Sequence, residues 1–224
     1  MKQYRKQLSK WVFYLPFFFF PFFSSAQQTF IVTALNASDN TGYGQYTYQK
    51  PGVYIAIGRT NEVDYFRDGR FNFALAFSQK GAFKAPNPEK GDFAAYNVRL
   101  NYAELNFNYW LKVKSIRAIV GLNAGYLINS SERGVAGVSI QSMYNNNYKK
   151  TDFSFTAGAG TMLGQHFMVH LTATYSILPI VSIAGVASQT LAFTNGPRNT
   201  LFSIGFTYIF KKKEEVIEEP TDEE

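Results

Sequence analysis

The chain has 224 residues, a length that accommodates one domain or a small pair of domains. Aromatic residues and charged residues each make up 17% of it, and a typical soluble domain carries about 25% charged residues. The mean hydropathy of -0.16 excludes a bundle of membrane helices, and the absence of cysteine excludes disulfides, thiolate metal sites and a thiol nucleophile. An aromatic-rich, charge-poor and mildly polar chain is typical of a membrane β-barrel, in which only every second strand residue meets lipid.

The first residues have the order of a secretory signal peptide. Residues 1–10 carry four basic residues and no acidic one, and the apolar run Trp11–Phe23 follows them. Small residues then lead to Ala26 and Gln27, where we expect cleavage. The apolar run is too short to cross roughly 30 Å of hydrocarbon as a helix, and two prolines interrupt it. The sequence therefore predicts a signal peptide over 1–26 and export by the Sec pathway.

The formal charge of +6 belongs largely to this segment. Without its four basic residues, the chain has 18 basic and 16 acidic residues, and no basic stripe stands out. Nothing therefore predicts binding to nucleic acid. The tail 211–224 begins with three lysines and then becomes strongly acidic, so we expect a solvated periplasmic tail.

Between these ends, apolar and polar residues alternate with period two. In 199–210, for example, Phe202, Ile204 and Phe206 share one face and Ser203 takes the other. Runs of about 10–12 residues are long enough for a tilted strand to cross a bilayer. The other segments with this clear alternation are 71–80, 116–128, 152–163 and 167–178.

Three less regular segments bring the strand count to eight. Residues 52–59 form a short strand, and 29–36 is the weakest assignment, needed for an even number. In 96–111 the phase reverses before Tyr102, where Val98 and Leu100 are the apolar residues. This reversal suggests a bulge. The predicted fold is all-β. It is an eight-stranded antiparallel transmembrane barrel, an up-and-down meander, within residues 27–210.

The gaps between the predicted strands alternate between long and short after the first pair. Long external loops and short periplasmic turns are typical of a membrane barrel. With both termini periplasmic, the gaps expected to face outward and to offer a surface to a protein partner are 37–51, 84–95, 130–151 and 179–198.

Three short motifs resemble a known family. Leu75–Gly81 is similar to the strand-ending YSQKG motif of the PorT-like outer-membrane β-barrels of Bacteroidetes. Tyr102–Leu105 resembles the YLEIP motif of that family, with Asn106 in place of its proline, and Val120–Tyr126 matches the next glycine-rich strand in character. The resemblance spans most of 29–210 and implies an eight-stranded barrel in the cell outer membrane. One family member is tied to a secretion machinery, a role that the resemblance does not carry to this chain.

The polar candidates for the barrel interior are Glu104, Arg117, Asn123 and His170. A hairpin centred on residue 165 places His170 opposite Gly160, where it is either a general base for a lumenal hydroxyl or a hydrogen-bonding residue of a filled lumen. Without a nucleophile motif such as GxSxG, the second reading is favoured. The full set of charged residues expected inside, where charges need partners, is Arg59, Lys80, Arg99, Glu104 and Arg117.

Aromatic residues near the strand ends are expected to form interfacial girdles against the outer-membrane lipid. Trp110 falls on the lumenal phase, so its position depends on the bulge. The aromatic residues expected in these girdles are Tyr109, Trp110, Tyr126, Tyr175 and Tyr208.

Eight strands leave an interior just wide enough for side chains, which disfavours a porin. No metal-ligand cluster or phosphate loop is evident, so neither a metal nor a cofactor is expected. We expect a non-enzymatic structural or interaction component, such as a part of an envelope or secretion machinery. The alternatives are a lipid-modifying barrel enzyme and a binder of a small ligand.

Overall fold

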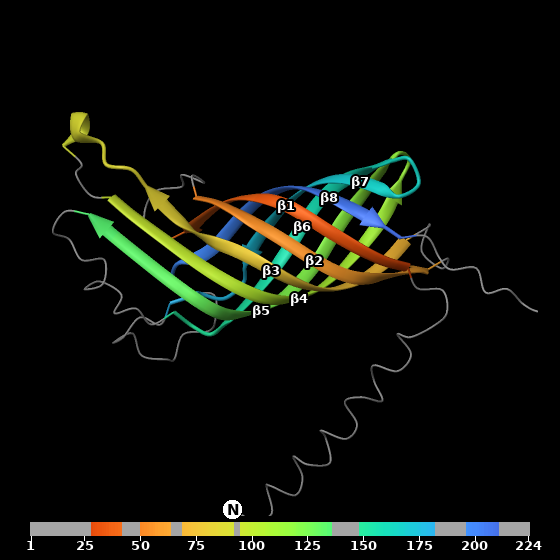
Figure 1. The fold of residues 1–224 in the computed structure, drawn as a ribbon, viewed down its shortest axis with the longest axis horizontal. Coiled ribbons are helices and arrows are strands. Elements are labelled where there is room, and N and C mark those ends of the chain that lie inside the picture. The colour runs from red at the N-terminus through yellow and green to blue at the C-terminus, as the bar shows by residue number, and fades with distance from the viewer. Residues whose placement is uncertain are drawn as a thin grey trace, which may run out of the picture. The chain divides into compact units, whose positions relative to one another are not determined.

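The computed structural model describes residues 28–41, 50–63, 69–91, 95–135, 148–181 and 196–210 (Figure 1). The predicted signal peptide with its cleavage site, and the predicted periplasmic tail, lie outside the described residues. No helix in the described ranges is long and apolar enough to span a membrane.

Eight antiparallel strands form a closed barrel in which each strand pairs with the next along the chain. Pairing of the last strand with the first closes the sheet, in registers such as Ala34 with Gly205. The strands are β1 (Gln28–Thr41), β2 (Lys50–Val63), β3 (Gly69–Lys84), β4 (Ala95–Val113), β5 (Ile116–Val135), β6 (Thr151–Leu163), β7 (Phe167–Ser176) and β8 (Arg198–Ile209). The predicted up-and-down meander is confirmed, and the weakest predicted strand, 29–36, is part of β1.

The side chains that point out of the barrel are apolar and exposed. Leu35 is 65% exposed, Leu171 61% and Leu122 57%, and buried inward residues such as Ala34, His170 and Asn123 alternate with them along the same strands. A water-soluble protein does not expose a continuous apolar band of this kind. The outward rows predicted for 71–80, 116–128, 152–163, 167–178 and 199–210 are therefore the outward rows of the structure.

The first five strands extend beyond the ranges predicted for them, and β1 and β2 have 14 residues each where 29–36 and 52–59 were predicted. β3, β4 and β5 have 16, 19 and 20 residues, and Figure 1 shows them reaching past their neighbours. These extensions shorten three of the connections, to 42–49, 85–94 and 136–150, and the fourth runs over 177–197, close to its predicted range. The short 3-10 helix η2 (Pro88–Lys90) lies in the second of them. The opposite end of the barrel has the tight turns 114–115 and 164–166 and a third connection, 64–68.

The bulge predicted beside Tyr102 is confirmed as a shift in register, but the predicted reversal of phase in β4 is wrong. The register shifts between Asn101 and Tyr102, and the additional residue is Ile128, in β5. Val98 and Leu100 consequently point inward like Tyr102, and all three are buried. Their apolar side chains are tolerated there because they pack on Ile180 and other residues that cover this end of the barrel.

The interior is filled in layers along the barrel axis. At the end with the tight turns, Phe30, Trp110, Met168 and Ile209 belong to one apolar cluster. At the loop end, a second apolar cluster joins the inner faces of β3–β5 to segment 177–181. Its members are Ala82, Val98, Leu100, Tyr102, Leu127, Ile180 and Val181. The polar side chains of the lumen lie between these two layers.

Candidate functional site: a buried ionic network in the lumen

The strongest interaction inside the barrel joins three charged side chains from three strands. Lys80 of β3 places its Nζ 2.7 Å from Oε1 of Glu104 in β4 and 2.9 Å from Oδ2 of Asp152 in β6. The three side chains are 1%, 4% and 0% exposed. Removal of such charges from water is costly, so each needs the others close by. With all three ionised, two carboxylates face one ammonium group.

Two further side chains complete the surroundings of this ion group. Asn199 of β8 donates from Nδ2 to Oδ2 of Asp152 at 3.0 Å, and the Lys80 ammonium lies 5.0 Å from the centre of the Tyr102 ring. A cation over an aromatic ring at this distance is stabilised by the ring quadrupole. The network therefore connects β3, β4, β6 and β8 across the lumen, near the ends that lead to the long loops.

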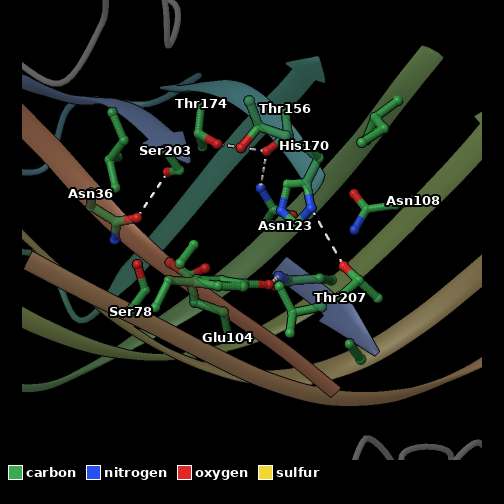
Figure 2. A pocket seen from close by; sticks show the side chains of 18 of the residues that line it. Asn36, Ser78, Glu104, Asn108, Asn123, Thr156, His170, Thr174, Ser203 and Thr207 are labelled. Atoms are coloured by element: carbon green, nitrogen blue, oxygen red, sulfur yellow. Dashed lines mark hydrogen bonds between the residues drawn. The ribbon is translucent and has the colours of Figure 1, made fainter. Parts of the chain in front are cut away.

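His170 lies on the same inner surface, nearer the tight turns. Its Nδ1 is 3.4 Å from Oγ1 of Thr207, and it pairs with Gly160 across β6 and β7, as the hairpin spacing predicts. Gly205 of β8 makes room for the ring, since a Cβ there would lie 2.4 Å from Nε2 of His170. In Figure 2 His170 and Glu104 point into the same cavity from different walls.

Neutral hydrogen bonds occupy the wall between His170 and the ion group (Figure 2). Asn123 donates from Nδ2 to Oγ1 of Thr156 at 2.8 Å, and the hydroxyls of Thr156 and Thr174 are 2.7 Å apart. On the facing wall, the Ser203 hydroxyl donates to Oδ1 of Asn36 at 2.8 Å. These groups bond to one another, whereas the side-chain oxygens of Asn106 and Asn108, which line the same cavity, accept no hydrogen bond within the described residues.

Of the predicted interior candidates, Glu104, Asn123 and His170 are buried in the lumen. Arg117 is half-buried, opposite Gly160 near the tight turns, and is not part of the ion group. Lys80 is inside, as predicted.

The prediction that Arg59 and Arg99 lie inside is wrong, because both are exposed on the outer face. Each follows the outward phase of its strand, Arg59 with Ile55 and Ile57. Trp110, considered for the outer girdle, is 4% exposed and packs inside against Phe30, with ring centroids 5.7 Å apart.

Asp152 is the member of the network that sequence reasoning missed. It precedes Ser154 and Thr156 at intervals of two, on the face already predicted to line the lumen. That phase alone was enough to place it inside. Its position beside Lys80, 72 residues away in the chain, depends on the closure of the barrel.

A cavity of about 70 Å³ lies in the lumen and is lined by Tyr54, Glu104, Asn123 and His170, among others. A water molecule occupies at least about 10–15 Å³ on this measure, so the cavity suits a few waters. Within the described residues, no group of three or more His, Asp and Glu side chains is arranged to hold a metal ion.

No family model matches the chain, and no curated protein matches it. Among solved structures it is similar to Neisserial surface protein A, with a TM-score of 0.46 and 13% identity over 84% of this chain and 98% of that one. It is also similar to the outer membrane protein Ail of Yersinia pestis, with a TM-score of 0.44 and 16% identity over 82% and 99%. The outer membrane enzyme PagL has a TM-score of 0.33 and 13% identity over 80% and 98%. Likeness at this level assigns no activity, so the function is argued from this chain's own residues.

Proposed function

We propose that this chain is an outer-membrane β-barrel that serves as a structural or interaction component. In this proposal the Sec pathway exports it, residues 1–26 are removed, and the loops at the end with the long connections face outward to meet a protein partner. The observation that carries the proposal is the combination of an apolar exterior with an interior occupied by its own side chains.

The exterior supports insertion into a bilayer. Exposed leucine, isoleucine and phenylalanine side chains cover the outward face of all eight strands, and aromatic side chains gather at the ends of several strands. Near the tight turns, Tyr208 packs against Phe167 and Phe210, with ring centroids 4.9 Å apart in both pairs. At the loop end, Arg198 donates to the Tyr175 hydroxyl at 3.1 Å. Aromatic girdles of this kind lie at headgroup height in membrane barrels.

The interior argues against a pore. Lys80, Glu104 and Asp152 bind one another across the lumen toward the loop end, and apolar clusters lie at both ends of the barrel. An ion would have to separate the network and pass both apolar layers. We therefore infer that the residues available for function are outside the lumen, chiefly in the loops. The similarity of Leu75–Gly81 and Tyr102–Leu105 to the PorT-like family supports a place in that family of Bacteroidetes barrels.

Two measurements test this proposal. The first is migration on unboiled gels in SDS, because a closed membrane barrel runs as a compact species until it is boiled. Recovery of the protein in the soluble fraction, together with identical migration before and after boiling, would contradict membrane insertion. The second is conductance across a planar bilayer, for which we expect no steps. Reproducible single-channel steps would show that the lumen opens.

A partner at the loops is tested by photo-crosslinking in intact cells. A photoreactive residue replaces Glu89, exposed in η2, and a matched control replaces Lys114 in a tight turn at the other end. We expect a discrete adduct from position 89 that is absent at position 114. Equal adducts at both positions, or none at position 89, would contradict an outward-facing partner.

The lipid-modifying alternative depends on His170, because His166 lies in a tight turn and contacts the carbonyl of Ile209. The ring of His170 points into the lumen and away from the apolar exterior, where acyl chains would lie. An unchanged lipid acyl profile in a His170→Ala strain supports the proposal, and a changed profile would favour the enzyme. The small-ligand alternative is disfavoured by a cavity of about 70 Å³.

A further inference from the structure

Two exposed arginines and one buried lysine lie around one amide at the loop end of β4 and β5. Arg99 lies two residues from Asn97 on the same face of β4, and Arg133 of β5 is the direct cross-strand partner of Asn97. Lys50, the first residue of β2, donates from Nζ to Oδ1 of Asn97. Arg99 and Arg133 are exposed. Side chains that are neighbours along or across strands in this way are within reach of one another.

No acidic residue neutralises this cluster within the part of the chain that the structure describes. None of its three cations forms a salt bridge there. The adjacent Glu132 accepts a hydrogen bond from the Tyr148 hydroxyl. Positive charges held together without a counter-charge disfavour one another, so an anion bound among them would be stabilised.

The height of the cluster on the barrel indicates which anion would meet it. On the outward face of β4, the apolar row runs from Tyr109 through Phe107 to Ala103. The next outward residues, Asn101 and Arg99, are polar. Arg99 is four residues beyond Ala103, roughly 14 Å along a strand and about 10 Å along the normal for a tilted one. Arginine side chains can extend back toward the apolar boundary. Their charged ends then lie in the headgroup layer on the loop side.

We propose that Arg99 and Arg133, with the buried Lys50 beside them, bind the phosphate groups of a phosphorylated glycolipid in the outer leaflet, of the lipid A class. Two exposed guanidinium groups suit this ligand, because arginine contacts phosphate oxygens in pairs, and the buried Lys50 adds positive charge beside them. The Asn97 amide holds the lysine in place. This inference rests on the proposed outer-membrane location and adds a lipid partner to it.

The test uses the mature protein reconstituted in phosphatidylcholine nanodiscs. Native mass spectrometry measures the binding of phosphorylated lipid A and of the same lipid after removal of its phosphates. We expect the phosphorylated lipid to bind about tenfold more tightly, and the Arg99→Gln/Arg133→Gln variant to lose most of that preference. Equal binding of the two lipids by the unmodified protein would overturn the proposal.

The matched control removes two exposed cations at the opposite end, by Lys112→Gln and Lys114→Asn. Asparagine is chosen at 114 because Lys114 has a φ of 57°, which asparagine tolerates. This control is expected to keep the preference. An equal loss in both double variants would show a dependence on net charge and overturn the site. A third variant, Arg99→Lys/Arg133→Lys, keeps the charge and is expected to bind with intermediate affinity.

Two further measurements distinguish a failure of the lipid-binding inference from a failure of the proposed function. Millimolar inorganic phosphate is expected to displace little lipid A, and full displacement would identify a site for free phosphate instead. Heat-modifiable migration is measured on every variant before lipid is added. A protein that folds in the nanodisc and shows no phosphate preference contradicts this inference alone, and a protein that fails to insert contradicts the proposed function.

Discussion

The Lys80 ammonium lies 2.9 Å from the Asp152 carboxylate, although 72 positions separate the two residues in the chain. The contact spans the lumen from β3 to β6, and neither strand is a neighbour of the other in the sheet. It therefore joins opposite parts of the wall and stabilises the closed barrel against separation of its strands.

The first prediction concerns this network. Lys80→Met leaves the two carboxylates Glu104 and Asp152 buried without their cation, and we expect a loss of roughly 3–5 kcal/mol in the free energy of unfolding. The measurement is urea-induced unfolding in phospholipid vesicles. Lys90→Met in η2, where the side chain is exposed, is the control and should change little.

Removal of the two carboxylate charges should restore stability that Lys80→Met loses. The triple variant Lys80→Met, Glu104→Gln, Asp152→Asn is expected to recover much of the stability, because no unpaired charge then remains in the lumen. If Lys80→Met unfolds at the same urea concentration as Lys90→Met, the network has no stabilising role.

The second prediction compares neighbours that point in opposite directions. Trp110→Ala removes a buried ring that packs on Phe30, and a loss of about 3–5 kcal/mol is expected from the cavity. Tyr109→Ala removes an outward ring 4.8 Å from that of Phe71, for which about 0.5–1.5 kcal/mol is expected. The same vesicle unfolding assay measures both losses. A larger loss for Tyr109→Ala than for Trp110→Ala would mean that β4 has the opposite phase.

The third prediction tests the close approach of β8 to His170. In Gly205→Ala the new methyl group would lie 2.4 Å from Nε2 of His170 and 2.9 Å from the Cβ of Ala34. We expect a loss of about 1–3 kcal/mol from overpacking. Combination with His170→Ala should restore most of it, as measured by the temperature at which the compact gel species is lost. Additive losses in the double variant would rule out the contact as the cause.

The fourth prediction tests the position of the bilayer on β5. Leu122 is 57% exposed in the middle of the outward row, so Leu122→Arg should cost about 2–4 kcal/mol in vesicles. Ser131→Arg, beyond the apolar band on the same strand, should cost about 1 kcal/mol or less. Similar costs at the two positions would show that the apolar band does not lie in hydrocarbon.

The alternation of residues along single strands could be read from the sequence with good accuracy. Phe202, Ile204 and Phe206 face outward as predicted, and the tight turn at 164–166 placed His170 opposite Gly160. Both results depend on interactions between residues close in the chain. A period of two assigns the face of a strand, and a short turn determines the register of a hairpin.

The lengths of β3, β4 and β5 could not be predicted in this way. Past the apolar band their outer residues become polar, so the simple contrast between an apolar outside and a polar inside disappears. Val98 and Leu100 then look like outward residues, but they are buried under Ile180. Only the packing of segment 177–181 on the sheet, brought there from a distant part of the chain, decides their orientation.

The sequence by itself determined a barrel of eight antiparallel strands, its outward rows and the burial of Glu104, Asn123 and His170. The tertiary structure alone decided that Asp152 meets Lys80, that Arg99 points outward, and that Lys50 reaches Asn97 beside Arg99 and Arg133. The physical reason is that a strand's own pattern specifies which way a side chain points. The residue that it then meets across the lumen or beyond the next strand is set by the closure and stagger of the whole sheet.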